Sequence, residues 1–178
     1  AAIISFNGNK IVTTGMGGAI LLRNTVDYKK LKHIMSTSRI KHPWKVEHDG
    51  IGYNMRMANI NAAVGLNQLR NIEVILRKKR KLFSRYINVL SDDKYCYLND
   101  KNDEANPNLW VINIYLKERY IKHQQRFFHE LHKNNIYARE LWRPQHMSKY
   151  LQKYPRSDLR NTIKIWKSAI SLPSSDYL

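Results

Sequence analysis

Apolar and polar positions alternate in short blocks over the first third of the chain. Two apolar runs, Ala1–Ile4 and Ala19–Leu22, have the length and composition of β-strands. The polar, glycine-containing segment between them predicts tight turns. From Thr25 to Met35 apolar residues recur at helical spacing, and Thr25 is placed to cap that helix. The polar stretch Ser36–Gly50 predicts a loop.

The longest periodic stretch runs from Ala58 to Leu90 and predicts one long helix or two joined helices, with Asn59 as N-cap. The polar connection after it contains a short strand candidate at Tyr95–Leu98. The later pattern predicts a strand over 109–116, a helix over 120–134, a strand over 136–138 and a helix over 159–169. This order predicts a small α+β domain. We place the domain boundary after residue 90, which gives domains of residues 1–90 and 91–178.

One lysine, Lys10, stands among small polar residues between the first two strand candidates. A lysine in such a place can form a Schiff base with a carbonyl compound, although most lysines beside glycine and asparagine are solvated loop residues. The glycines at 15, 17 and 18 do not have the spacing of a dinucleotide-binding fingerprint, and no Gly-Lys-Ser/Thr sequence marks a P-loop. The segment alone therefore leaves catalysis and a plain surface loop both open.

Three segments together resemble one enzyme family. Residues 5–18 are similar to the lysine segment that binds pyridoxal phosphate (PLP) in the DegT/DnrJ/EryC1/StrS sugar aminotransferases. Residues 52–57 with 59–69 resemble a second block of that family, and residues 142–146 with 171–175 resemble a looser third. The segments follow the family order and span nearly the whole chain. The resemblance implies an α/β fold: the C-terminal part of a fold-type-I PLP aminotransferase, with the end of the large α/β domain and the small α+β C-terminal domain.

The resemblance also implies a reaction. Enzymes of this family use PLP to move an amino group, commonly from glutamate, to a nucleotide-linked keto sugar for surface polysaccharide biosynthesis. Lys10 matches the catalytic lysine that holds the cofactor, and Ser5 matches a serine that binds the cofactor phosphate. Asn54 matches an asparagine that reaches the phosphate in the partner subunit. The resemblance therefore implies a homodimer with shared active sites, and the single cysteine together with the lack of a signal-peptide pattern favours the cytoplasm.

Substrate contacts follow from the same comparison. Arg56 is the candidate for an anionic part of the substrate, and Trp142 and His146 match a segment near the sugar site. Glu140 stands where many relatives have proline, so we expect the local substrate contacts to differ. The family's remaining cofactor contacts would precede residue 1. We therefore expect a C-terminal part of a longer enzyme, inactive alone.

The net charge of the chain suggests alternatives to the aminotransferase function. The chain has 31 Lys and Arg against 14 Asp and Glu, a formal net charge of +17, and such a balance favours anionic partners. One alternative is a basic nucleic-acid-binding module, and another is a catalytically inactive family member. The only cysteine, Cys96, excludes an internal disulfide and predicts a packed small residue in a reducing compartment. We expect no metal site and no membrane partner, because neither ligand spacing nor a long apolar run is present.

Overall fold

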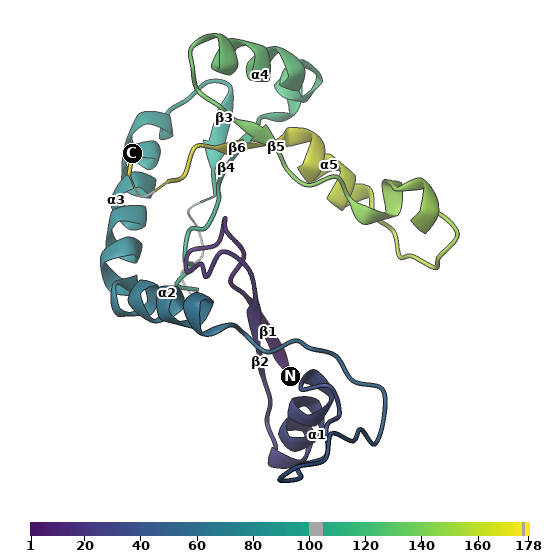
Figure 1. Ribbon diagram of the computed structural model, residues 1–178. Helices are drawn as coiled ribbons and strands as arrows, with labels where there is room; N and C mark the ends of the chain where they lie inside the picture. Colours follow the sequence, from purple (N-terminus) through teal and green to yellow (C-terminus); the bar gives the residue numbers. More distant parts are fainter. Residues whose placement is uncertain (100–104, 176) are drawn as a thin grey trace. The chain divides into compact units, whose positions relative to one another are not determined.

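The computed structural model describes residues 1–99, 105–175 and 177–178 (Figure 1). The chain divides into two compact units, Ala1–Glu73 and Val74–Leu178, which we describe separately. The domain boundary expected after residue 90 stays a prediction. None of the helices within the described ranges combines the length and the apolar character that crossing a membrane requires.

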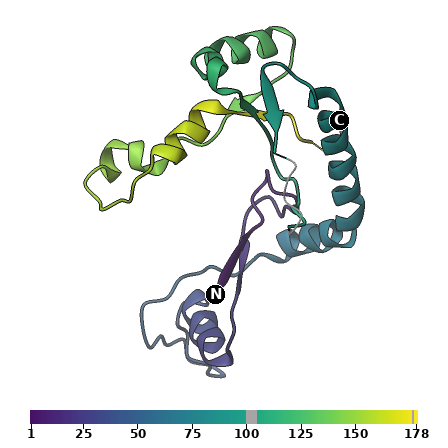
Figure 2. The same ribbon diagram turned by 180° about the vertical axis from the view of Figure 1, so that it is seen from behind.

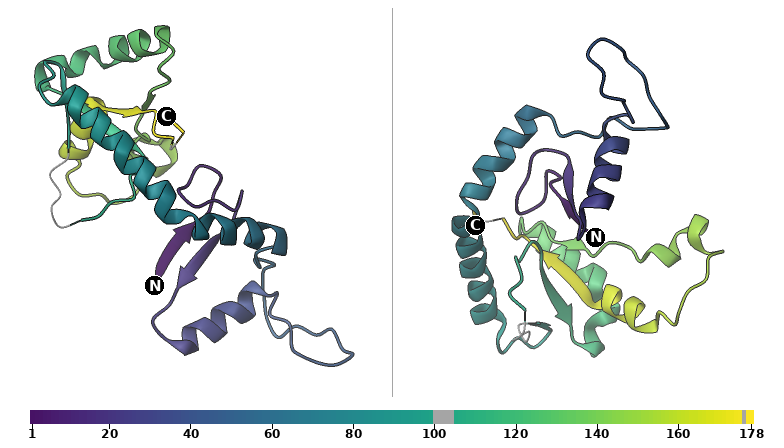
Figure 3. Two further views of the ribbon diagram at one scale, coloured as in Figure 1. Left: turned by 90° about the vertical axis from the view of Figure 1, so that its left-hand side faces the viewer. Right: turned by 90° about the horizontal axis from the view of Figure 1, so that it is seen from below.

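The first unit is built on an antiparallel strand pair (Figure 3). Strand β1 (Ala2–Ser5) pairs with β2 (Gly18–Leu21), from Ala2 opposite Leu21 to Ser5 opposite Gly18. Helix α1 (Thr25–Met35) ends where its periodicity predicts and begins one residue earlier than a Thr25 cap would allow. The expected cap was wrong, because Asn24 rather than Thr25 is the N-cap. The Asn24 Oδ1 accepts a hydrogen bond from the backbone N–H of Asp27 at 2.8 Å.

The long periodic stretch forms two helices, α2 (Asn59–Arg70) and α3 (Ile72–Leu90). Asn71 separates them, and its side-chain amide donates to the carbonyl of Asn67 at 2.9 Å. The prediction of Asn59 as N-cap was wrong, since Ala58 takes that position without a side-chain cap. Asn59 is instead the first residue of α2.

The second unit is organised around a four-stranded antiparallel sheet (Figure 2). Its strands are β3 (Cys96–Leu98), β4 (Ile112–Leu116), β5 (Arg139–Glu140) and β6 (Ala169–Leu172), in the spatial order β3-β4-β6-β5. The helical segments are η1 (Glu118–His123), α4 (Gln124–Lys133), η2 (Gln145–Met147), η3 (Lys149–Leu151) and α5 (Arg160–Ser168).

One face of this sheet carries the core. Residues alternate on β4, so that Ile112, Ile114 and Leu116 are buried while the positions between them turn to the other face. Phenylalanines and leucines, α4 residues among them, pack against the buried cluster. Cys96 belongs to this cluster and is 5% exposed. Burial raises the pKa of its thiol to about 12, as expected for a packed, unreactive cysteine.

The strands of the second unit differ from the prediction in several places. Strand β4 starts later than expected because Leu109 has a φ of 54°, and the Trp110 N–H bonds to the Asn108 side chain. Residues 136–138 are not a strand. After α4, Asn135 takes a φ of 60°, and pairing begins only at Arg139. The strand β6 was not predicted.

Candidate functional site

The candidate lysine lies in the loop that joins β1 and β2. The Phe6 N–H donates to the Gly17 carbonyl at 2.9 Å, and the Thr14 N–H donates to the Phe6 carbonyl at 3.0 Å. Gly17 has a φ of 108°, a conformation that side-chain-bearing residues rarely adopt. The two hydrogen bonds at Phe6 therefore close the base of the loop.

Ser5 and Lys10 lie on either side of Asn7 in this loop. Ser5 ends β1, and its Oγ accepts the Asn7 N–H at 3.4 Å. The Asn7 carbonyl accepts the Lys10 N–H at 3.0 Å, which forms a turn. Lys10 is half-buried, whereas Ser5 is exposed. The structure thus places the predicted lysine and the predicted phosphate-binding serine on one short, hydrogen-bonded segment.

Helix α2 packs directly on this loop at Thr14, which is 4% exposed. The Asn61 side-chain amide donates to the Thr14 carbonyl at 2.6 Å. One turn later, a Cβ on Gly65 would lie 2.6 Å from the Thr14 methyl group, so only glycine lets the helix approach this closely. Sequence reasoning did not assign a role to Asn61. Asn61 lies inside the second family-like block, but its partner is a main-chain carbonyl, which no motif specifies.

Asn54 and Arg56 follow the loop that was predicted after α1. Asn54 forms an isolated β-bridge with Ser36, and the Tyr53 N–H donates to the Ile34 carbonyl at 2.7 Å. Both candidate side chains are exposed. Met57 comes next, and its Cε lies 3.1 Å from the position that a Cβ on Gly17 would take. The segment that carries Asn54 and Arg56 therefore ends against the lysine loop.

The loop between α1 and Asn54 is held by side chains. The His33 Nε2 and the Asp49 carboxylate are 2.6 Å apart, and this hydrogen bond lowers the pKa of Asp49. His48 bonds to the Thr37 carbonyl at 2.7 Å. Within the described ranges, no group of three or more His, Cys, Asp or Glu side chains is arranged to hold a metal ion.

The remaining candidates, Trp142 and His146, lie on one segment of the second unit. Trp142 is 64% exposed and stacks on Trp110, with ring centroids 5.3 Å apart and ring planes at 30°. The His146 Nε2 is buried and has no hydrogen-bond partner in the part of the chain that the structure describes. Such an atom is unusual in a folded protein. His146 and Arg143 also line a hollow of about 780 Å³.

A buried lysine of α3 supports the tryptophan pair. Lys79 is 6% exposed, and its ammonium group donates to the carbonyl of Trp110 at 3.3 Å and to that of Ser174. The Ser174 hydroxyl also donates to the Trp110 carbonyl, at 3.1 Å. On the same helix, the Tyr86 hydroxyl donates to the Pro173 carbonyl at 2.9 Å, and burial raises its pKa. Sequence reasoning missed Lys79 and Trp110, because their link is a main-chain contact between distant segments.

Comparison with known proteins identifies the family of this chain. The model of the DegT/DnrJ/EryC1/StrS aminotransferase family matches residues 1–178. GDP-perosamine synthase of Escherichia coli O157:H7 is 29% identical over 174 residues, which are 96% of this chain and 45% of that protein. The chain thus spans about half the length of the curated relatives it matches.

Solved structures agree on the fold. PseC of Helicobacter pylori, an aminotransferase involved in the biosynthesis of pseudoaminic acid, superposes with a TM-score of 0.92 at 23% identity, over 99% of this chain and 48% of that one. The PLP-form of Spr1654 from Streptococcus pneumoniae gives a TM-score of 0.85 at 19% identity, over 99% of this chain and 47% of that one. The predicted fold class, part of a fold-type-I aminotransferase, is confirmed.

Proposed function

Because the chain belongs to the DegT/DnrJ/EryC1/StrS aminotransferase family, we propose that it forms part of an enzyme that uses PLP to move an amino group to a nucleotide-linked keto sugar. The Escherichia coli relative, a GDP-perosamine synthase, supports this substrate class, and the PLP-form of the pneumococcal neighbour supports the cofactor. We propose glutamate as amino donor, a cytoplasmic location and a product used for surface polysaccharide.

The observation that carries the proposal is the hydrogen-bonded loop with Lys10 and Ser5. Its groups fit PLP chemically, because the half-buried lysine offers a primary amine for the aldehyde. The Ser5 Oγ accepts the Asn7 N–H, which leaves the hydroxyl proton available for a phosphate oxygen. When bound, the cofactor supplies an electron sink that makes the carbon beside the transferred nitrogen acidic.

The protein's own groups then bind, orient and move a proton. The Lys10 amine would hold the cofactor and, once released, would carry a proton to and from the reacting carbon. The Phe6–Gly17 and Asn61–Thr14 hydrogen bonds fix the loop, so the amine is held in a defined position.

Substrate binding falls to exposed residues. The Arg56 guanidinium binds an anionic part of the substrate, and Trp142 offers a flat apolar face to the sugar. His146 is a further sugar contact through the part of its half-buried ring that lines the hollow, since its Nε2 is buried. We propose a homodimer in which Asn54 donates its amide to the cofactor phosphate of the partner subunit. That role suits its exposed place at the end of the loop after α1.

The test is chemical labelling. The full-length protein is incubated with PLP, reduced with borohydride and digested, and the modified lysine is located by mass spectrometry. We expect selective modification of Lys10, and its loss in Lys10→Arg. Lys30→Arg, an exposed lysine of α1, is the matched control and should leave the labelling unchanged.

Labelling spread over many lysines would refute the proposal, because Lys10 would then be an ordinary surface lysine. Selective labelling without amino transfer from glutamate to any nucleotide-linked keto sugar would instead identify an inactive family member.

A further inference from the structure

The second face of the four-stranded sheet carries an aromatic pair. Tyr97 on β3 lies opposite Tyr115 on β4 in the strand register. Their rings are stacked, with centroids 5.6 Å apart and planes at 29°. Tyr97 is 49% exposed, so the pair presents an aromatic surface to solvent. The cofactor and substrate residues proposed above do not include either tyrosine.

The tyrosines line a hollow of about 500 Å³. Cations and apolar groups share it: Lys117 follows β4, while Lys164 and the half-exposed Ile165 come from α5. The Lys117 ammonium donates to the Asp93 carbonyl at 2.6 Å and is therefore engaged. A pocket of this volume suits a small planar ligand rather than the surface of another protein.

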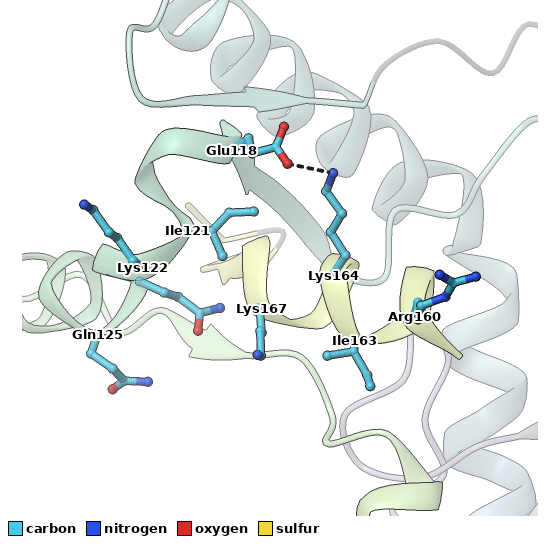
Figure 4. Close-up of a pocket in the computed structure, with 9 residues that line it drawn as sticks. Glu118, Ile121, Lys122, Gln125, Arg160, Ile163, Lys164 and Lys167 are labelled. Atoms are coloured by element: carbon cyan, nitrogen blue, oxygen red, sulfur yellow. Dashed lines mark hydrogen bonds and ion pairs between the residues drawn. The ribbon is translucent and has the colours of Figure 1, made fainter. Parts of the chain in front are cut away.

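A second hollow of about 700 Å³ adjoins the first and shares Glu118, Ile121 and Lys164 with it (Figure 4). Figure 4 shows Lys164 directed at the Glu118 carboxylate, and the two groups are 3.1 Å apart. This pair is exposed, so it contributes little and can exchange for another anion. The hollow adds three cations, which are Lys122, Arg160 and Lys167. Among residues that the structure describes, Lys122 and Lys167 have no ion-pair partner.

We propose that these adjoining hollows bind a nucleotide, with the base on the Tyr97–Tyr115 pair and the phosphate along Lys164, Lys167 and Lys122. Stacking on an aromatic side chain combined with a basic groove is the chemistry by which proteins bind unpaired nucleotides. The formal charge of +17 attracts such polyanions from a distance. Lysine stems are flexible, so their ammonium groups turn to a phosphate readily.

The aromatic pair favours a single strand or a free nucleotide over a duplex, because the bases of a duplex stack on one another and are hidden from the tyrosines. Stacking and phosphate contacts treat the bases alike, so we expect little preference among them.

The test uses a fluorescein-labelled oligouridylate and fluorescence anisotropy with the full-length protein. Tyr97→Ala should weaken binding about tenfold or more, through lost stacking, and Tyr97→Phe should restore it. Lys164→Gln should weaken binding and reduce its salt dependence. Glu118→Gln should tighten binding, because it removes the carboxylate that competes for Lys164.

The matched controls are Tyr154→Ala and Lys153→Gln. Tyr154 is 56% exposed and its ring lies 5.5 Å from the Lys153 ammonium, outside both hollows, so these variants should bind as the unmodified protein does. Thermal melting identifies any variant that has lost its fold. A variant that melts early is replaced by Tyr97→Leu.

Two sources of the nucleotide are separated by competition. Displacement of the oligomer by UDP, weakened by Tyr97→Ala, would support a free nucleotide; displacement by unlabelled oligouridylate alone would support a single strand. Either way the proposed aminotransferase residues are untouched. Equal binding by all variants, or binding of duplex DNA as tightly as of the oligomer, would overturn the proposal and leave only nonspecific charge attraction.

Discussion

The buried ammonium of Lys79 offers a sharp test of what holds the second unit together. Replacing it with methionine keeps an unbranched apolar stem, one heavy atom shorter, but removes the charge and the hydrogen bonds to the Trp110 and Ser174 carbonyls. The Trp110 carbonyl keeps a donor, the Ser174 hydroxyl at 3.1 Å. The Ser174 carbonyl loses the ammonium that it accepts from. Both carbonyls therefore lose the lysine, but the Trp110 carbonyl still accepts from the Ser174 hydroxyl.

A buried acceptor without its donor costs about 1–3 kcal/mol. Relief from burying a charge offsets part of this cost. We expect the free energy of unfolding to fall by about 1–2 kcal/mol, which at a urea m-value of about 2 kcal/mol/M lowers the midpoint by about 0.5–1 M. We also expect the near-ultraviolet circular dichroism of the Trp110–Trp142 stack to weaken, because the Trp110 main chain is no longer held from α3.

The assay is urea unfolding of the full-length protein, followed by tryptophan fluorescence and by far-ultraviolet circular dichroism. Lys81→Met is the matched control, since Lys81 is exposed on the same helix, and its midpoint should stay within the usual range for surface changes. A Lys79→Met midpoint equal to or above that of the unmodified protein would show that desolvation of the ammonium outweighs its hydrogen bonds.

Two further substitutions test local packing and charge. Gly65→Ala should lower the urea midpoint, because its Cβ would meet the Thr14 methyl at 2.6 Å, even though alanine is normally the better helix former. Gly50→Ala is the control: its Cβ would meet nothing within 4 Å, so the midpoint should not fall. Burial raises the pKa of Asp93, but the N–H groups of Cys96 and Tyr95 outweigh it and hold the pKa below its usual value. The stabilisation is therefore present above about pH 4 and lost as pH falls through the lowered pKa, so Asp93→Ala should cost about 1 kcal/mol at pH 7 and little at pH 2 in urea titrations. Equal costs at both pH values would contradict this.

The predictable elements were those whose signal is local. Helical periodicity predicts α1 to within about one residue, and the paired helices α2 and α3, because an amphipathic stripe is carried by neighbouring turns. Strand β6 follows α5 without a turn residue between them. Its conformation is set by pairing with β4, from Ile112 opposite Leu172 to Tyr115 opposite Ala169. No pattern within four residues reports such a partner.

The residues of the candidate site also fall into those that a local motif can nominate and those that it cannot. Ser5 and Lys10 stand within one segment, so a motif can nominate both, and their roles stay predictions. Asn61 and Lys79 donate to main-chain carbonyls of distant residues, those of Thr14 and Trp110. Any residue supplies such a carbonyl, so its sequence position carries no chemical signature. Supporting contacts of this kind become visible only in three dimensions.

The strand order of the second unit has a consequence for synthesis. β6 lies between β4 and β5, although it follows both along the chain, and its Ile170 is completely buried. A growing polypeptide thus makes β4 and β5, the two neighbours of β6, before β6 itself. Until then the edge of β4 that pairs with β6 is unpaired. Until residues 169–172 leave the ribosome, that open edge is a place where two nascent chains can pair with each other instead.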